Sequence, residues 1–339
     1  MRGMGTMAGS GTDADGRSEA RRSGRHRGTP SRLSEQLAVT ALLRALARLT
    51  ALTFLVVAVL AQFPFWHPEV LFFLLLAVFT LLGEARSYLT HFGPFIGLVA
   101  VYDSFRAIAD DLSGNVHVHE MINVDEWLFG GTLPTVWLQS HLWDGQVSWF
   151  DYYFYLLYIL HFPMPAALAL YLWRRRPALY RPFVASLVVL SFSAFITYAA
   201  FPAAPPWMAS EQGDIAPVAR IAGDVWASLG VHGYGSIYDR ISPNPVAAIP
   251  SLHAAYPTLF LLFMGRCFGW RRVWWLAFYP ISVWVGIVYF AEHYVIDFIL
   301  GALYAAAAYA VTMLVFARLR RRRSRGSPAG ATQPEAAAG

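Results

Sequence analysis

Lysine is absent from this sequence, and charged residues of any kind are scarce. All 26 basic residues are arginine, and charged side chains make up 14% of the 339 residues. Soluble domains usually contain about 25% charged residues, so the composition excludes an ordinary soluble globular enzyme. Cysteine occurs once, at Cys267, which excludes a disulfide framework or a cysteine-based metal cluster within one chain.

Hydrophobic residues, by contrast, make up 57% of the chain and occur in blocks long enough to cross a bilayer. In a bilayer the backbone must satisfy its own hydrogen bonds, which favours helices. The sequence therefore predicts an all-α, multi-pass transmembrane helix bundle of about eight helices. The expected helices span residues 46–64, 69–84, 89–107, 150–173, 182–201, 251–268, 273–291 and 295–317.

The arginines are distributed unevenly, and their positions predict the orientation. Residues 1–33 and 318–339 are basic, poor in large apolar side chains, and expected to be disordered tails. With both tails in the cytoplasm, 23 of the 26 arginines lie on the inner side, as the positive-inside rule requires. Arg106, Arg220 and Arg240 are then the outer arginines. We expect a cell-membrane protein, and no nucleic-acid partner.

Two long segments, 108–149 and 202–250, lie on the expected outer side. The first is acidic yet rich in tryptophan and leucine, which predicts helices along the membrane surface. His117, His119 and Glu120 form a weak candidate metal site, because two histidines and one carboxylate without a further cluster make a poor ligand set. Asp125 and Trp127 are candidates for binding a polyol acceptor by position alone.

A histidine and an aspartate stand four residues apart where the last apolar helix begins. At this spacing His293 and Asp297 share one helix face, so Asp297 can accept from one imidazole nitrogen and leave the other as base or nucleophile. The alternative is an interfacial histidine with a polar neighbour. Ionisable residues just inside apolar helices are costly and usually functional.

A second histidine stands at the start of the helix expected over 251–268. Pro250 and Ser251 suit a helix N-terminus, whose backbone N–H groups attract anions, and His253 in the first turn could protonate a departing oxygen on a phosphate. Taken singly, the segment reads more simply as a helix start with a histidine facing lipid headgroups. Together with His293 and Asp297, it fits one half of a phosphoryl-transfer site.

With these two motifs the sequence resembles the type 2 phosphatidic acid phosphatase superfamily, in the branch of inositol phosphorylceramide synthases. Pro-Ser-Leu-His and His-Tyr-x-x-Asp, typical of that branch, stand at residues 250–253 and 293–297. Residues 102–106 (Tyr-Asp-Ser-Phe-Arg) and 204–207 (Ala-Pro-Pro-Trp) are further similarities. The resemblance implies a six-helix catalytic membrane domain over 89–317, preceded by two additional transmembrane helices over 46–84.

The resemblance also implies the role of each site residue. His293 would attack phosphorus to give a phosphohistidine, Asp297 would orient His293, and His253 would act as the general acid, with no metal or other cofactor. Two family features are missing. The Ser-Arg of the third motif falls at Gly286-Ile287, and the first motif, Lys-x6-Arg-Pro, cannot occur without lysine. Arg174-x6-Arg181-Pro182 lies on the expected inner side, so we interpret it as a topology signal.

The missing motifs leave the phosphate-binding cation open. Arg106 is the first candidate for this cation, because its motif matches the branch, and Arg240 is the second. For Arg220, ordinary contact with lipid headgroups is an equally good explanation. The expected substrate-binding residues are Arg106, Arg240, Ser251, Asp103 and Tyr294.

The sequence thus predicts an integral membrane phosphotransferase that moves phosphoinositol-type headgroups from a phospholipid donor at the outer leaflet. Transfer to a lipid acceptor and hydrolysis by water, as in a lipid phosphate phosphatase, differ only in the acceptor. A non-catalytic lipid transporter or scaffold is the alternative from another class, but the helices contain few mid-membrane polar residues and no convincing repeat.

Overall fold

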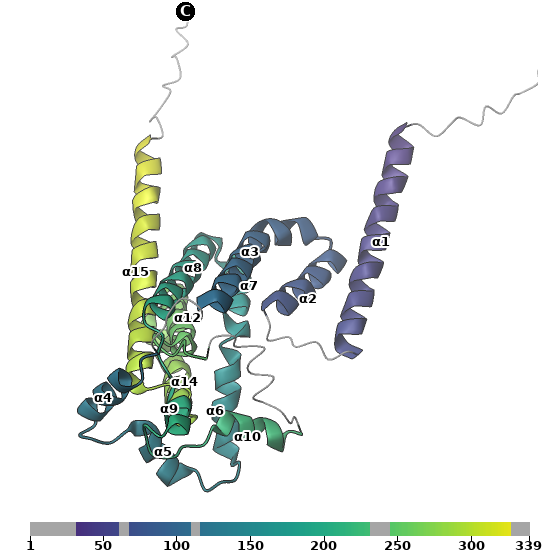
Figure 1. The fold of residues 1–339 in the computed structure, drawn as a ribbon. Helices are drawn as coiled ribbons and strands as arrows, with labels where there is room; N and C mark the ends of the chain where they lie inside the picture. Colours follow the sequence, from purple (N-terminus) through teal and green to yellow (C-terminus); the bar gives the residue numbers. More distant parts are fainter. Residues whose placement is uncertain (1–31, 61–67, 110–115, 231–244, 327–339) are drawn as a thin grey trace, which may run out of the picture. The chain divides into compact units, whose positions relative to one another are not determined.

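The computed structural model describes residues 32–60, 68–109, 116–230 and 245–326. These residues are helical, with two isolated bridges that join His117 to Ala203 and Ala203 to Ala247. The helices are α1 (Arg32–Leu60), α2 (Pro68–Leu81), α3 (Ala85–Ala109), α4 (His119–Leu128), α5 (Pro134–Leu142), α6 (Trp149–Leu160), α7 (Pro163–Arg175), α8 (Pro177–Ala200), α9 (Pro206–Gln212), α10 (Ile221–Ser228), α12 (Leu252–Phe268), α13 (Trp270–Val273), a 3-10 turn (Trp274–Ala277), α14 (Phe278–Tyr289) and α15 (Val295–Gly326) (Figure 1).

The chain divides into two units, Met1–Thr50 and Ala51–Gly339. The first unit contains the beginning of α1 in its described part. The second contains α2 to α15 and both histidine motifs.

Each of the eight expected apolar segments coincides with helical structure, so the all-α expectation is confirmed. Within the described residues, four helical stretches are long and apolar enough to cross a membrane: Glu35–Leu60, Pro177–Ala200, Trp270–Tyr289 and Val295–Arg322. A fifth span results if α6 and α7, which meet at a 51° bend, form one broken span. The bend precedes Pro163, whose ring lacks the N–H that an uninterrupted helix would use.

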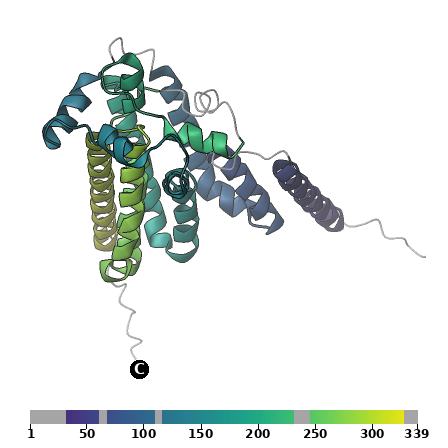
Figure 2. The ribbon, with the colours of Figure 1, turned by 90° about the horizontal axis from the view of Figure 1, so that it is seen from below.

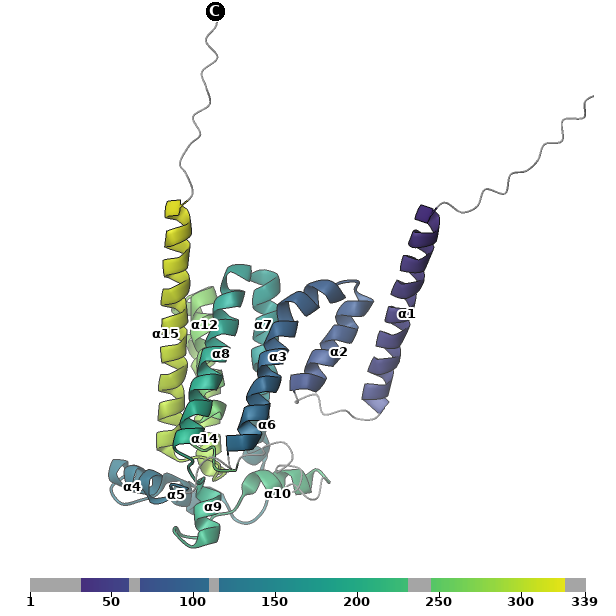
Figure 3. The same ribbon diagram turned by 45° about the horizontal axis from the view of Figure 1, so that its top comes forward.

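The short helices gather at one end of the long ones. Figure 3 shows α8, α12, α14 and α15 running alongside one another, with α4, α5, α9 and α10 across the end where α12 and α15 begin. Figure 2 shows these short helices from that end. Segment 108–149 contains the helices α4 and α5, in which Trp127 is 80% exposed; their position along the membrane surface stays a prediction.

A glycine allows α12 and α15 to approach closely at their beginnings. A Cβ added to Gly301 on α15 would lie 2.3 Å from the carbonyl oxygen of Ser251, which is far inside van der Waals contact. Ser251 caps α12, because its Oγ accepts from the amide of Ala254 at 3.3 Å. The absence of a side chain at Gly301 therefore sets the separation of the helix starts that carry the two histidine motifs.

The beginning of α15 is held by an aspartate from α4. The carboxylate of Asp125 accepts hydrogen bonds from the amides of Val295 at 2.8 Å and Ile296 at 3.0 Å, which helix geometry leaves without an intrahelical partner. Asp125 is completely buried. The expectation that Asp125 binds a polyol is therefore wrong, because both carboxylate oxygens are occupied by backbone amides and the side chain is closed to ligands.

We expect Gly301→Ala to lower the melting temperature and the catalytic activity, because the new methyl group must push Ser251 and the start of α12 away from α15. Gly93→Ala on α3 is the matched control, since a Cβ at Gly93 meets nothing within 4 Å. Thermal unfolding and activity of the two purified variants would test this. Equal behaviour of Gly301→Ala and Gly93→Ala would contradict the close-contact argument.

Asp125 predicts a pH dependence of stability. Burial raises the pKa of its carboxyl to about 6, against the two amide hydrogen bonds that lower it, and repulsion from Asp297 adds to the rise. The pKa of this carboxyl in the unfolded chain is about 4. Between pH ~4 and ~6 the folded protein therefore keeps a proton on Asp125 that the unfolded chain has released. The contribution of this group to the free energy of unfolding therefore falls as pH rises through that window.

We expect Asp125→Asn to remove this slope in thermal unfolding measured between pH 4 and 6, whereas Asp144→Asn, at an exposed position, retains it. The same slope in the wild type and in Asp125→Asn would contradict the assignment.

Candidate active site

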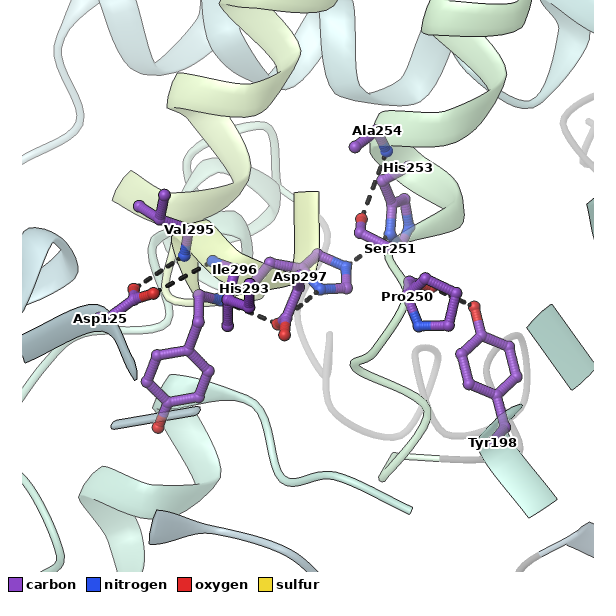
Figure 4. Close-up of polar contacts among 11 residues, drawn as sticks. Asp125, Tyr198, Pro250, Ser251, His253, Ala254, His293, Val295, Ile296 and Asp297 are labelled. Carbon is purple, nitrogen blue, oxygen red and sulfur yellow. Dashed lines mark hydrogen bonds and ion pairs between the residues drawn. The ribbon is translucent and has the colours of Figure 1, made fainter. Parts of the chain in front are cut away.

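The two histidines occupy the beginnings of adjacent helices. His253 lies in the first turn of α12, two residues after the Ser251 cap, and His293 lies in the turn between α14 and α15. Figure 4 shows the two imidazole rings facing each other. His253 Nδ1 lies 2.9 Å from His293 Nε2, which is hydrogen-bond distance. The fold therefore brings together two motifs that are 40 residues apart.

Asp297 holds the other side of His293. Its Oδ2 lies 3.3 Å from His293 Nδ1 and accepts from the amide of Tyr294 at 2.9 Å. The backbone carbonyl of Asp297 accepts from the amide of Ser251 at 3.0 Å. One residue thus connects both histidine motifs. With the carboxylate on Nδ1, the proton of a neutral His293 lies on that nitrogen, and the lone pair is on Nε2, facing His253.

The turn that carries His293 is tightly constrained. Ala291 has a φ of 61°, in the left-handed region that non-glycine residues seldom adopt. The amides of Glu292 and His293 both donate to the carbonyl of Ile287, at 3.0 and 3.1 Å. The carbonyl of Ala291 accepts from the amide of Trp207, at the start of α9. These bonds hold the backbone from Ala291 to His293 in place.

His253 is held by two neighbouring aromatic rings. The ring of Tyr158 stacks on His253 with centroids 4.8 Å apart, and His161 packs edge-on at 4.4 Å. Tyr158 and His161 are buried at the α6–α7 bend. The signal available in the sequence was His161 itself, an ionisable residue inside an apolar stretch.

Arg220 contacts the turn between α14 and α15 that carries the candidate nucleophile His293, hereafter the nucleophile turn. Its Nε donates to the carboxylate of Glu292 at 3.1 Å, and its guanidinium carbon lies 4.2 Å from the ring centroid of Trp207. Of the other two outer arginines, Arg106 lies on α3 in a stretch whose side chains are outside the described part of the structure, and Arg240 is outside the described residues. The side chain of Asp103 is likewise outside the described part.

Two further expected substrate-binding residues have structural partners. Ser251 is fully buried and caps α12. Tyr294 is buried and packs in a cluster with Met121 of α4. Their contacts with substrate remain predictions.

The histidines of the candidate metal motif have separate partners. His117 Nδ1 lies 2.6 Å from Glu120, and the His117 ring stacks on Phe201, whereas His119 lies 3.8 Å from Asp214. No group of three metal-ligating side chains occurs within the described residues.

Arg174, from the alternative basic motif, lies far from the histidines. It lies in the last turn of α7 and pairs with Glu84, after α2. Figure 3 shows the α7–α8 connection at the end of the helices opposite the short helices. The interpretation of Arg174 as a topology signal stays a prediction.

The arrangement of the site suits nucleophilic catalysis on a phosphorus centre. His293 is 4% exposed and is oriented by a fully buried carboxylate, which leaves Nε2 available as the nucleophile. His253 is within hydrogen-bond reach of the same nitrogen and can move a proton to or from an oxygen at that point.

Comparison with known proteins agrees with this geometry. Residues 119–311 match the family model described as the PAP2 superfamily. The phosphoinositol dihydroceramide synthase of Bacteroides thetaiotaomicron is 30% identical over 224 residues, which cover 61% of this chain and 71% of that protein. No solved structure matches. The family match covers more than half of the chain and includes both histidine motifs, and the chain therefore belongs to the PAP2 superfamily, as a membrane enzyme that acts as a lipid phosphotransferase or phosphatase.

Proposed function

We propose that this enzyme transfers phosphoinositol-type headgroups between lipids at the outer leaflet through a phosphohistidine on His293. The observation that carries the proposal is the relay Asp297–His293–His253, with contacts of 3.3 and 2.9 Å. The synthase name of the similar Bacteroides thetaiotaomicron protein supports the phosphoinositol headgroup.

In the first step the phosphate of the donor lipid binds between the rings of His253 and His293 and replaces their direct hydrogen bond. His293 Nε2 attacks phosphorus, a P–N bond forms, and the P–O bond to the lipid alcohol breaks. Protonated His253 gives its proton to the leaving oxygen, and Asp297 stabilises the positive charge that develops on His293.

In the second step an acceptor hydroxyl approaches from the side of His253. Now neutral, His253 takes the hydroxyl proton while the acceptor oxygen attacks phosphorus and the P–N bond breaks. His293 returns to its starting state, and His253 is protonated again for the next donor. Every proton is exchanged between His253 and a substrate oxygen, so the cycle balances.

The burial of the nucleophile favours a lipid alcohol over water as the acceptor. His293 is 4% exposed, Asp297 is fully buried, and the aromatic rings of Tyr158 and His161 pack against the ring of His253. A site that excludes water protects a reactive phosphohistidine from hydrolysis. Hydrolysis by water, as in a lipid phosphatase, uses the same first step and is an outcome of the test below.

The distribution of arginines supports an outer site with both termini in the cytoplasm. The α7–α8 connection carries Arg174, Arg175, Arg176 and Arg181 at the end opposite α4, α5, α9 and α10, and the α15 end carries six more arginines. Arginine-rich connections remain in the cytoplasm. The histidine pair would then face the outer leaflet.

An apolar groove beside the site supports a lipid substrate. It encloses about 790 Å³ between α5, α14 and the start of α15. Its wall includes Trp284, whose Nε1 donates to the carbonyl of Ala254 at 3.4 Å, next to His253. Val285 and Ile281, which also line it, continue into the exposed apolar face of the α14 span. An acyl chain of a lipid bound at His293 would fit this groove.

His293→Ala should abolish headgroup release from phosphatidylinositol, because the variant lacks the nucleophile. Purified wild type and variant would be incubated with headgroup-labelled phosphatidylinositol, with and without ceramide or diacylglycerol, and an alkaline quench would preserve the phosphohistidine for mapping. We expect label on residue 293 and transfer to a lipid alcohol. Release into water alone would indicate the phosphatase, and full activity of His293→Ala would refute the mechanism.

Val285→Trp should fill the groove and impair long-chain donors selectively. We expect kcat/KM for dipalmitoyl phosphatidylinositol to fall about tenfold, with little change for the dioctanoyl lipid, since lost apolar contacts are worth about this much. Leu303→Trp, on the exposed face of α15, is the matched control. An unchanged ratio between the two donors in Val285→Trp would contradict the groove assignment.

A further inference from the structure

A phosphate that reaches His293 needs a cation, and neither cation of the usual family motifs is present in this chain. Charge on the phosphate oxygens must be stabilised by donors that are already in place. Gly286 and Ile287 stand where the family has Ser-Arg, and no lysine occurs. We propose that Arg220 binds the substrate phosphate, an inference that rests on the proposed function.

The side chain of Arg220 is held against the nucleophile turn at two points. Its Nε donates to Glu292, the residue directly before His293, and its guanidinium lies over the ring of Trp207. Trp207 is itself bonded to this turn, through its amide and the carbonyl of Ala291 at 3.0 Å. Both groups that contact the guanidinium therefore belong to, or are fixed to, the segment that carries the nucleophile.

The backbone of Arg220 is anchored to the same region by a buried glutamine. Gln139 of α5 accepts from the amide of Ala219 at 2.7 Å and donates to its carbonyl at 2.8 Å. The same side-chain amide donates to the carbonyl of Tyr289, at the end of α14, at 2.8 Å. The residue before Arg220 is thus tied to the helix that ends at the nucleophile turn.

The exposure of the ion pair suits an anion site. The side chain of Glu292 is 2% exposed and that of Arg220 is 20% exposed, so Arg220 is the more accessible partner, with its Nη2 buried. A guanidinium carries five N–H donors in a planar fork, so one group can hold a carboxylate through Nε and present another edge to a phosphate. In the proposed arrangement Glu292 orients Arg220, and the substrate phosphate meets the guanidinium away from Glu292.

The competing explanation is that Arg220 only neutralises the buried carboxylate of Glu292. Removing the arginine alone would leave an uncompensated buried charge and damage the fold under either explanation. The double variant Arg220→Gln/Glu292→Gln removes both charges and separates the two. A structural role predicts that this double variant recovers activity, and phosphate binding predicts that it does not.

A second ion pair of the same kind provides the matched control. Arg174 pairs with Glu84, and its guanidinium lies 4.6 Å from the ring centroid of Trp173, at the opposite end of the helices. Both side chains of this pair are 43% exposed, so it is a more exposed pair than Arg220–Glu292. Arg174→Gln/Glu84→Gln removes the same kinds of group, an arginine, a carboxylate and an aromatic contact, without touching the histidine pair.

The experiment measures kcat/KM for dioctanoyl phosphatidylinositol, inhibition by inorganic phosphate, and the rise in melting temperature that inorganic phosphate produces. We expect Arg220→Gln/Glu292→Gln to lose about 100-fold or more in kcat/KM, the usual cost of one such donor, together with both phosphate effects. Arg174→Gln/Glu84→Gln should retain all three. Arg220→Lys should lie between, since a lysine supplies charge without the planar fork.

Retention of kcat/KM and of both phosphate effects in Arg220→Gln/Glu292→Gln would overturn the assignment of Arg220 and leave the phosphohistidine mechanism standing. If instead the wild type released no headgroup, the proposed function would fail. The melting-temperature response to inorganic phosphate would still show whether Arg220 forms an anion site.

Discussion

The active end of this protein depends on Asp297, the buried carboxylate in the first turn of α15. Its side chain accepts from His293 Nδ1 and from the amide of Tyr294, and its backbone carbonyl accepts from Ser251. The tautomer of His293, the start of α15 and the start of α12 are therefore fixed by one residue. Two helix beginnings that are separate in the sequence become one site through it.

The short helices at this end support the same junction. Asp125 of α4 caps α15, Gln139 of α5 joins Ala219 to the end of α14, and Trp207 at the start of α9 is bonded to Ala291. Gly301 permits the close approach of α15 to Ser251. The segments between the long helices thus build the wall around the histidines, which accounts for the burial of His293 and Asp297.

This chain lacks the phosphate-binding cations of the family motifs, and Arg220 contacts the turn that carries His293. The family places its phosphate-binding cations in motifs that this sequence lacks, yet phosphoryl transfer still requires positive charge at the phosphate. Arg220, between α9 and α10, is held by Glu292 and Trp207 at the nucleophile turn. We infer that the loop before α10 supplies that charge, because Gln139 fixes its backbone to the end of α14.

The sequence by itself determined the helical segments, the two histidine motifs and the family. Long apolar blocks and i, i+4 spacing are local properties, so the relation of His293 to Asp297 could be read directly. Tertiary structure decided the partners that lie far apart in the chain. Asp125 and Ile296 are 171 residues apart and Arg220 and Glu292 are 72 apart, and no periodicity links such pairs. The capping role of Asp125, the aromatic cradle of His253 and the place of Arg220 therefore emerged only when the helices packed together.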